Sequence, residues 1–407
     1  MKFSKNGIAR AAAISALLLN TLSPAVFAAE SLQVVGNGSS SVNNVKVDLT
    51  HTTTVTQSNE AYVSNDVEVN SSTGENSAND NTGGDVVILT GSALSNVNLD
   101  TKVNLNRADL GRCATCNGDT EVLVSGNGFG SENEVDLSKD TENQVFQDNK
   151  AQIHNDVDVK TKTGENDANR NTGGSTAVVT GNAESNVTVE NAANANIARV
   201  GTPSGAAGSS LLRARILDNG SSSDNDIDVD LNRSNLVVQD NKAQIHNDVD
   251  VKTKTGENSA NDNTGGDVLV DTGRSLGNVT IDNLANFNFA AADCGCYTTV
   301  DAKVAGNGFE SENEVEAEIV NDLAVYQDNR SDLRNELENK VDTGENWANR
   351  NTEGAGGDPT IVTGHSSQNS TVSNAANVNT SGASLDLPNG LTLNLGFDLG
   401  ALLGILH

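Results

Sequence analysis

The stretch QDNKAQIHNDVDVKTKTGEN spans Gln147–Asn166 and occurs again, without a change, at Gln239–Asn258. Looser copies lie at Gln57–Asn76 and Gln327–Asn346. Related segments at a nearly constant spacing are the signature of repeat architectures, in which each repeat packs mainly on its neighbours. The fold of this chain is therefore expected to follow from the spacing and the chemistry of this stretch.

Two landmarks define four units. The tetrapeptide Thr-Gly-Glu-Asn begins at Thr73, Thr163, Thr255 and Thr343, in steps of 90, 92 and 88 residues. An upstream Asn-Gly pair keeps the same three steps, so each unit has about 90 residues. Glycine and asparagine are typical turn residues. The predicted repeat turns contain Gly74, Asn76, Gly164, Asn166, Gly256, Asn258, Gly344 and Asn346.

The units alternate between two types. Units one and three carry Asp80 and Asp262 shortly after the tetrapeptide, where units two and four carry Arg170 and Arg350. Cysteines follow only units one and three. This ABAB pattern indicates that a pair of units was duplicated.

Side chains alternate within the repeated stretch. In Asp156–Thr163, Val or Thr occupies every second position, with Asp or Lys between. A period of two, with β-branched residues on one face, predicts a strand with one buried face and one face in water. A shorter spacing of 16 or 17 residues separates Asn133, Asn149, Asn166 and Asn182. It predicts short rungs with a turn at each of these asparagines.

The composition favours a coil over separate globular domains. Aromatic residues make up 3% of the chain, which leaves little large apolar surface for a thick core. Inward Asn and Thr side chains need hydrogen-bond partners, and in a solenoid the same residues of successive rungs supply them. We therefore expect an all-β, repetitive β-solenoid. Four tandem immunoglobulin-like β-sandwiches are the alternative, although such domains need a denser core with aromatic anchors.

The N-terminus has the pattern of a secretory signal peptide. Residues 1–28 contain a basic start, an apolar run at Ala11–Leu22 and small residues up to Ala28, as such signals do. We expect a secreted protein, extracellular or at the cell surface, without a membrane span once the signal is removed. The rest of the chain divides into units 29–112, 113–200, 216–293 and 294–384, a flexible linker at 201–215 and an apolar C-terminal strand segment at 385–407. That last segment is expected either to complete another subunit's sheet or to cap its own coil.

The chain is strongly acidic. Its formal net charge is −30, and removing the three basic residues of the signal leaves 22 basic and 55 acidic residues, a charge of −33. A negative charge of this size argues against nucleic acid and against anionic lipid as partners.

Four cysteines lie in the joints after units one and three. Cys113 and Cys116 form one close pair, and Cys294 and Cys296 form another. In a secreted chain such residues are expected to form disulfides. The spacing allows local bridges or a cross-link between the two joints.

Two acidic turns give the predicted ligand sites. Asn79–Asp85 and its copy Asn261–Asp267 combine oxygen ligands with glycines, as calcium-binding turns do. The candidate calcium ligands are Asp80, Asp85, Asp262 and Asp267. No other cofactor is indicated, and the sequence shows no pattern of nucleophile, base or paired carboxylates. The chain is therefore not expected to be an enzyme.

The units Thr163-Gly-Glu-Asn-Asp-Ala and Thr255-Gly-Glu-Asn-Ser-Ala resemble the Gly-x-Asn-x-Ala core of curlin repeats. The resemblance implies a secreted bacterial β-solenoid subunit of adhesive matrix fibres. This chain departs from the curlin pattern in its shorter predicted rungs, in the missing second regularly placed Gln and in its superperiod of about 90 residues.

Together these features predict a secreted structural or adhesive protein of a cell surface, biofilm or extracellular matrix. The expected partners are copies of the chain itself, other surface proteins or glycans. The alternative is a calcium- or glycan-binding surface module without catalysis.

Overall fold

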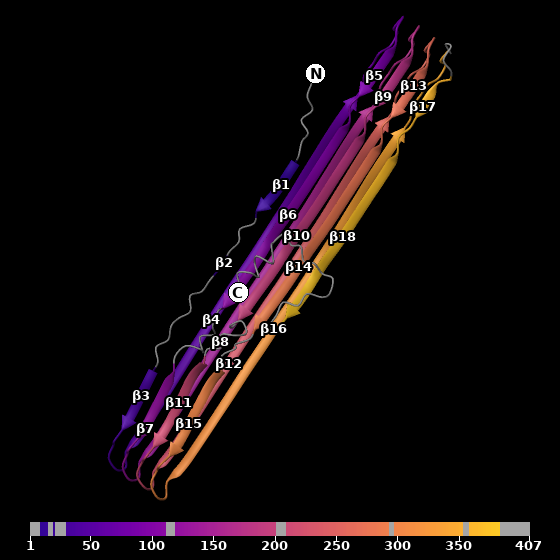
Figure 1. The fold of residues 1–407 in the computed structure, drawn as a ribbon. Coiled ribbons are helices and arrows are strands. Elements are labelled where there is room, and N and C mark those ends of the chain that lie inside the picture. The colour runs from indigo at the N-terminus through magenta and orange to yellow at the C-terminus, as the bar shows by residue number, and fades with distance from the viewer. Residues whose placement is uncertain are drawn as a thin grey trace.

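The computed structural model describes residues 9–14, 19–20, 30–110, 119–200, 209–292, 297–352 and 358–382. Within these ranges every helix or strand is a β-strand, and all paired strands are parallel. Each of the four units makes one turn of a flattened coil, and the four turns stack as rungs (Figure 1). The predicted β-solenoid of four repeats is confirmed.

One rung consists of four strands. In rung 2, β7 (Thr120–Ser125) leads through a turn into β8 (Glu132–Gly164), which is 33 residues long. A second turn leads to β9 (Thr176–Thr180), and β10 (Ala183–Val200) then returns along β8. The other rungs repeat this order, with β3 (Glu30–Val35), β4 (Val42–Gly74), β5 (Val86–Thr90) and β6 (Ala93–Leu110) in rung 1, β11 (Ser209–Leu217), β12 (Asp224–Gly256), β13 (Val268–Thr272) and β14 (Ser275–Ala292) in rung 3, and β15 (Tyr297–Ala305), β16 (Glu312–Gly344), β17 (Thr360–Val362) and β18 (Ser366–Ser381) in rung 4.

Equivalent strands of the four rungs form four sheets. The long sheet is β4, β8, β12 and β16, and the return sheet is β6, β10, β14 and β18. The entry sheet is β3, β7, β11 and β15, and the corner sheet is β5, β9, β13 and β17. Two short N-terminal strands, β1 (Ala9–Ile14) and β2 (Leu19–Asn20), pair with the outer edge of β6. At about 3.3 Å per residue, a strand of 33 residues extends for about 110 Å.

Side-chain ladders hold the long strands flat. The strands run side by side with little twist (Figure 1), and the register between β8 and β12 is unbroken from Glu132↔Asp224 to Gly164↔Gly256. Flat sheets are unusual unless stacking or specific side-chain ladders stabilise them. In this fold, each residue lies above its equivalent in the next rung, which is the arrangement that ladders require.

The core is a thin layer between two sheets. The entry sheet covers the first part of the long sheet, where Val124 and Leu137 belong to one buried cluster. The return sheet covers much of the rest, where Val159 and Val189 belong to another. The side chains are small, so each cluster must extend through all four rungs to bury its apolar surface.

The predicted alternation along Asp156–Thr163 is confirmed. Val157, Val159, Thr161 and Thr163 are at most 1% exposed. The Asp and Lys residues between them are exposed or half-buried on the outer face. The period of two in the sequence therefore gives the inward and outward faces of the long strand correctly.

Inward asparagines form amide ladders. The Nδ2 of Asn59 donates to the Oδ1 of Asn149 at 3.1 Å, Asn149 donates to Asn241 at 3.1 Å, and Asn241 donates to Asn329 at 3.0 Å. A second ladder on the return sheet faces this one, and Asn149 also donates to Asn196 at 2.7 Å. The buried amides thus satisfy one another, which offsets the cost of removing them from water.

The prediction of short rungs with turns at every sixteenth or seventeenth residue is wrong. Asn133 and Asn149 lie inside β8 and are at most 1% exposed. These asparagines point inward and pair between rungs, so they recur for a reason other than turn formation. The repeated 20-residue stretch is the second half of one long strand and the start of the turn that follows it.

The remaining predictions concern the joints between units and the C-terminal segment. Of the flexible linker expected at 201–215, residues 209–215 belong to β11. Cys113, Cys116, Cys294 and Cys296 lie outside the described residues, as does the apolar segment 385–407.

Substitution of Asn247 by Ala tests the amide ladders. Asn247 is fully buried, its Nδ2 donates to Asn335 at 2.7 Å and to Asn283 at 3.0 Å, and its Oδ1 accepts from Asn155 at 2.7 Å. Asn247→Ala should lower the free energy of unfolding by about 1–3 kcal/mol, because buried amides lose their partners. Denaturant unfolding followed by circular dichroism measures this, with the exposed Asn98→Ala as control. Equal midpoints for the two variants would show that the ladder does not stabilise the fold.

Candidate assembly interface

The coil is open at rung 4. Val315 on β16 occupies the same inward row as Val135 and Ile227, which are both 0% exposed, yet Val315 is 47% exposed. Ile319 and Leu323 point into the same layer and are 54% and 58% exposed. These side chains belong to the core by position, and they face water because no further rung covers them in the described part of the chain.

The backbone edges at both ends of the stack are long. β4 and β16 are the outermost strands of the long sheet, and each has 33 residues. A strand at the edge of a sheet presents a row of N–H and C=O groups that can pair with another strand. Natural proteins usually shorten or cover such edges, whereas here no described strand covers either one.

The amide ladder in the repeat turns ends with an unused donor. The Nδ2 of Asn76 donates to Asn166 at 3.0 Å, Asn166 donates to Asn258 at 2.8 Å, and Asn258 donates to Asn346 at 2.9 Å. The Nδ2 of Asn346 is buried and has no hydrogen-bond partner among the described residues. Since a buried donor without a partner costs free energy, this atom is poised to bond to one more Oδ1.

The glycines of the repeat turns end the long strands. Gly74, Gly164, Gly256 and Gly344 have φ between 111° and 122°, a backbone conformation that favours glycine. A Cβ on Gly164 would collide with the carbonyl group of Gly256 in the next rung. The turn therefore needs glycine both for its conformation and for the close approach of two rungs.

The candidate calcium ligands have other partners. The Nε and Nη2 of Arg170 donate to the two carboxylate oxygens of Asp80, at 2.7 and 2.8 Å. Arg350 binds Asp262 at the same two distances. These arginines lower the pKa values of Asp80 and Asp262 mainly by hydrogen bonding. The alternation of Asp and Arg between unit types thus joins rung 1 to rung 2 and rung 3 to rung 4.

The four candidate aspartates lie in two separate turns. Asp85 lies in the rung 1 turn, where its Oδ1 accepts a hydrogen bond from the backbone N–H of Ser175 at 2.9 Å. Asp267 lies in the equivalent turn of rung 3, two rungs away. Among the described residues, no three His, Cys, Asp or Glu side chains are grouped so that they could hold a metal ion.

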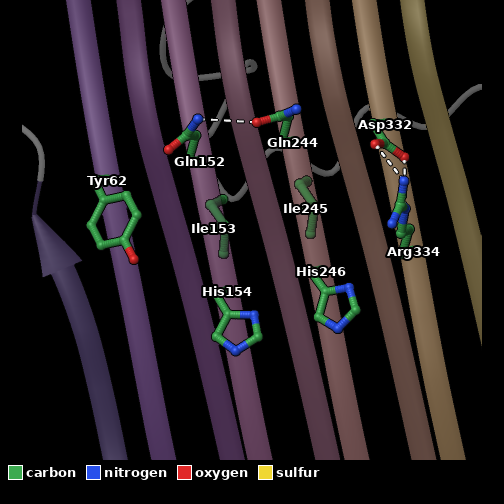
Figure 2. A pocket seen from close by; sticks show the side chains of 9 residues that line it. All are labelled: Tyr62, Gln152, Ile153, His154, Gln244, Ile245, His246, Asp332 and Arg334. Atoms are coloured by element: carbon green, nitrogen blue, oxygen red, sulfur yellow. Dashed lines mark hydrogen bonds and ion pairs between the residues drawn. The ribbon is translucent and has the colours of Figure 1, made fainter.

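A shallow hollow lies on the outer face of the long sheet (Figure 2). The rings of His154 and His246 stack there with centroids 5.1 Å apart, and Gln152 donates to Gln244 at 3.0 Å. Tyr62 lies at one side, and Asp332 and Arg334 at the other (Figure 2). The His and Gln side chains pair between rungs, and Arg334 pairs with Asp332 along one strand. These contacts resemble the side-chain ladders of the interior.

Sequence analysis missed one buried cation, Lys139, and one half-buried cation, Arg233. Lys139 points inward on β8 in the row of Leu49, Leu231 and Ile319, and is 9% exposed. Burial lowers its pKa, and burial also lowers the pKa of Arg233 in the next rung. Val135, Leu137 and Lys139 occupy every second position, so the period of two places Lys139 on the inner face.

Carboxylates stack in register on the outer face. Asp148, Asp240 and Asp328 occupy one row. Burial raises the pKa of Asp240, and repulsion from Asp328 and Asp148 raises it further. Burial and neighbouring carboxylates raise the pKa of Asp228 in the same way. A raised pKa means that the fold favours the protonated form, so these rows destabilise the fold at neutral pH and cease to do so as pH falls through the folded-state pKa.

Glu257 behaves in the opposite way. Lys254 lies 2.6 Å from one carboxylate oxygen of Glu257, and Lys162 lies 3.0 Å from the other. Hydrogen bonds from these lysines lower the pKa of Glu257 to about 2. The stabilisation from this cluster is present above the ordinary pKa of a glutamate and is lost only as pH falls towards about 2.

Comparisons of the chain with protein-family models, curated proteins and solved structures found no match. Within the described ranges, no helix is long and apolar enough to cross a membrane. The function must therefore be inferred from the geometry of the rung ends, the turns and the ladders.

Substitution of Asp240 by Asn should stabilise the fold at neutral pH. The change removes the charge that Asp148 and Asp328 repel. We expect a higher thermal midpoint than wild type at pH 7, and a difference that shrinks towards pH 3, where wild-type Asp240 is itself largely protonated (an ordinary Asp pKa is about 3.9). Differential scanning calorimetry at both pH values measures this. Asp267→Asn, outside the stacked acidic rows, is the control, and an equal gain from it would contradict the explanation.

Proposed function

We propose that this chain is a secreted structural and adhesive protein of a cell surface or extracellular matrix, and that it assembles by stacking copies end to end. The observation that carries the proposal is the open rung 4, where inward side chains such as Val315 and Leu323 are about half exposed. Solenoid proteins that remain monomeric need terminal repeats with a polar outer face. In the described part of the chain, rung 4 instead ends on the same inward rows as the rungs before it.

The flanks of the molecule support this assignment. The outer face of the long sheet carries rows of Asp, Glu and Lys, and the net charge of the chain is −30. Such a surface keeps an exposed assembly soluble and limits association through the flanks. Growth would thus be directed to the two ends, and the acidic flanks would meet cations, basic proteins or polar glycans of the surroundings.

Secretion is part of the proposal because of the N-terminal pattern. Residues 1–28 combine basic residues, an apolar run and small residues before Ala29, which is typical of a cleaved signal. A chain with a thin core and long open edges is also safest when it is exported before it assembles.

The calcium-binding module stays a weaker proposal. It rests on the acidic turns, in which the carboxylates of Asp80 and Asp262 already bind Arg170 and Arg350. A calcium ion would have to compete with a bidentate guanidinium at each of these positions.

Electron microscopy of the purified chain, prepared without residues 1–28, tests assembly directly. We expect unbranched fibres with a width of about 110 Å, set by the long strand, and light scattering that rises after a lag. Addition of preformed fragments should shorten the lag. Particles of single-chain mass at every concentration and pH tried would contradict the proposal.

A further inference from the structure

The geometry points to a head-to-tail junction in which rung 4 of one copy pairs with rung 1 of a second copy. The pairing keeps the parallel register that joins successive rungs within the chain. The inference rests on the proposed function, and it adds the partner surface, the direction and the register. Four separate features of the two ends carry it.

The first feature is a pair of glycines, Gly91 and Gly38, whose positions in rung 1 leave room for a Cβ. A Cβ on Gly181 in rung 2 would lie 2.6 Å from the carbonyl carbon of Gly91 in rung 1, and Cβ atoms on Gly273 and Gly364 would collide with the backbone of the rung before them. A Cβ on Gly91 would meet no described residue within 4 Å, and φ of Gly91 is not positive. Glycine at this position becomes necessary only when another strand lies against rung 1.

Gly38 repeats the pattern at the opposite end of the rung. A Cβ on Gly128 would lie 2.5 Å from the backbone nitrogen of Ser39, and one on Gly220 would lie 2.5 Å from the carbonyl carbon of Gly128. A Cβ on Gly38, by contrast, would come within 4 Å of no atom in the part of the chain that the structure describes. Rung 1 is therefore shaped at two distant points to accept the backbone of a preceding rung.

The second feature is the amide ladder. The buried Nδ2 of Asn346 has no partner among the described residues, and the next Oδ1 in the ladder would be that of Asn76 in the second copy. Other rows continue with like residues as well, because Asn329 would meet Asn59 and Gln327 would meet Gln57. All of these ladders would run through the junction without interruption.

The third feature is the charge on the outer rows. Arg350 would meet Asp80 of the second copy, as Arg170 meets Asp80 within the chain. The remaining opposite-charge pairs are Arg330 with Glu60 and Glu316 with Lys46. Within the chain, Glu60 and Lys46 already bind an oppositely charged residue of rung 2, Lys150 and Asp136. A rung of type B followed by a rung of type A also continues the ABAB order.

Not every row is favourable. Four rows would bring like charges together: Glu345 would meet Glu75, Glu318 would meet Asp48, Glu336 would meet Asp66, and Glu338 would meet Glu68. Glutamates already stack in the first of these rows within the chain, at Glu75, Glu165, Glu257 and Glu345. The rows that begin at Asp66 and Glu68 are likewise acidic in all four rungs. The fold thus already accommodates like-charge rows of this kind, and the opposite-charge rows give the junction its specificity.

The fourth feature is that the two ends differ, so the contact joins unlike surfaces and does not form a closed two-fold dimer. The surface of rung 4 fits rung 1 and not another rung 4, because strands that met in a two-fold contact would run antiparallel and the rows would no longer match. Heterologous contacts of this kind generate open filaments when no rotation closes them into a ring. Each added copy exposes the same rung 4 again.

The N-terminal strands occupy the edge that the junction requires. β1 pairs with β6 from Ala9↔Val97 to Ile14↔Lys102, and β2 pairs at Leu19↔Arg107. In the stack, β18 of the preceding copy would take this edge of β6. Removal of residues 1–28 would therefore free rung 1 for assembly.

Gly91→Ala tests the junction in the chain that begins at Ala29. Its Cβ has free space in the isolated molecule, so the far-ultraviolet spectrum and thermal midpoint should match wild type. Fibre growth should slow by about tenfold or more, because overpacking at a junction costs of the order of 1–3 kcal/mol. The control is Asn98→Ala, which removes an exposed side chain of β6 in the same rung. This variant should grow as wild type does. Gly38→Ala repeats the test at the other end of rung 1, should Gly91→Ala alter the fold.

Directional growth separates a blocked end from a general defect. Labelled wild-type seeds supplied with Gly91→Ala monomers should gain at most one copy at the rung 1 end and none at the rung 4 end, and a small fraction of the variant in wild-type monomers should stop growth at one end only. The full chain with residues 1–28 should fail to elongate rung 4 ends. Growth of Gly91→Ala at the wild-type rate, or a small fraction of the variant that stops wild-type growth equally at both ends, would overturn the junction while wild-type fibres still support the proposed function. Absence of wild-type fibres would instead refute the proposed function itself.

Discussion

The stacking of an asparagine side chain on its own equivalent in the next rung is the interaction on which the rest of this structure depends. Each inward amide donates to one neighbour and accepts from another, as Asn149 does between Asn59 and Asn241. The ladder requires residue-for-residue register, and register in turn requires strands that stay flat over their whole length. With few large apolar side chains available, the amides fill the interior and also fix the alignment that the small valine clusters alone would leave free to slip.

Sequence alone predicted what depends on local pattern. The four units, their ABAB order and the inward face of Val157 and Val159 follow from spacing and alternation, and the structure agrees with each of them. The length of a rung could not be obtained in this way, because the partner of Asn149 lies 92 residues away at Asn241. An asparagine that pairs across rungs and one that forms a turn have the same local signature. The pairing of Asp80, a candidate calcium ligand, is hidden from the sequence for a similar reason, since its partner Arg170 is 90 residues distant.

Electrostatics in this fold follow from the same register. In-register stacking brings identical charges together wherever a unit is copied, and Asp240 between Asp148 and Asp328 shows the cost as a raised pKa. Alternation of unit types relieves the cost elsewhere, because a type A carboxylate then faces a type B guanidinium. The divergence of A from B is thus physically useful in a stack, where an array of identical units would repeat every repulsion at each step.

The unusual length of the long strand has a mechanical consequence. Each copy adds four strands to each sheet of the proposed stack, a rise of about 19 Å at about 4.8 Å per strand. The assembly would then be a ribbon about 110 Å wide whose two sheets are only about 10 Å apart. Bending stiffness grows with the cube of the dimension in the plane of bending, so such a ribbon resists sideways deflection and flexes readily through its thin direction. A filament of this shape can follow a curved surface closely while it stays rigid along the surface.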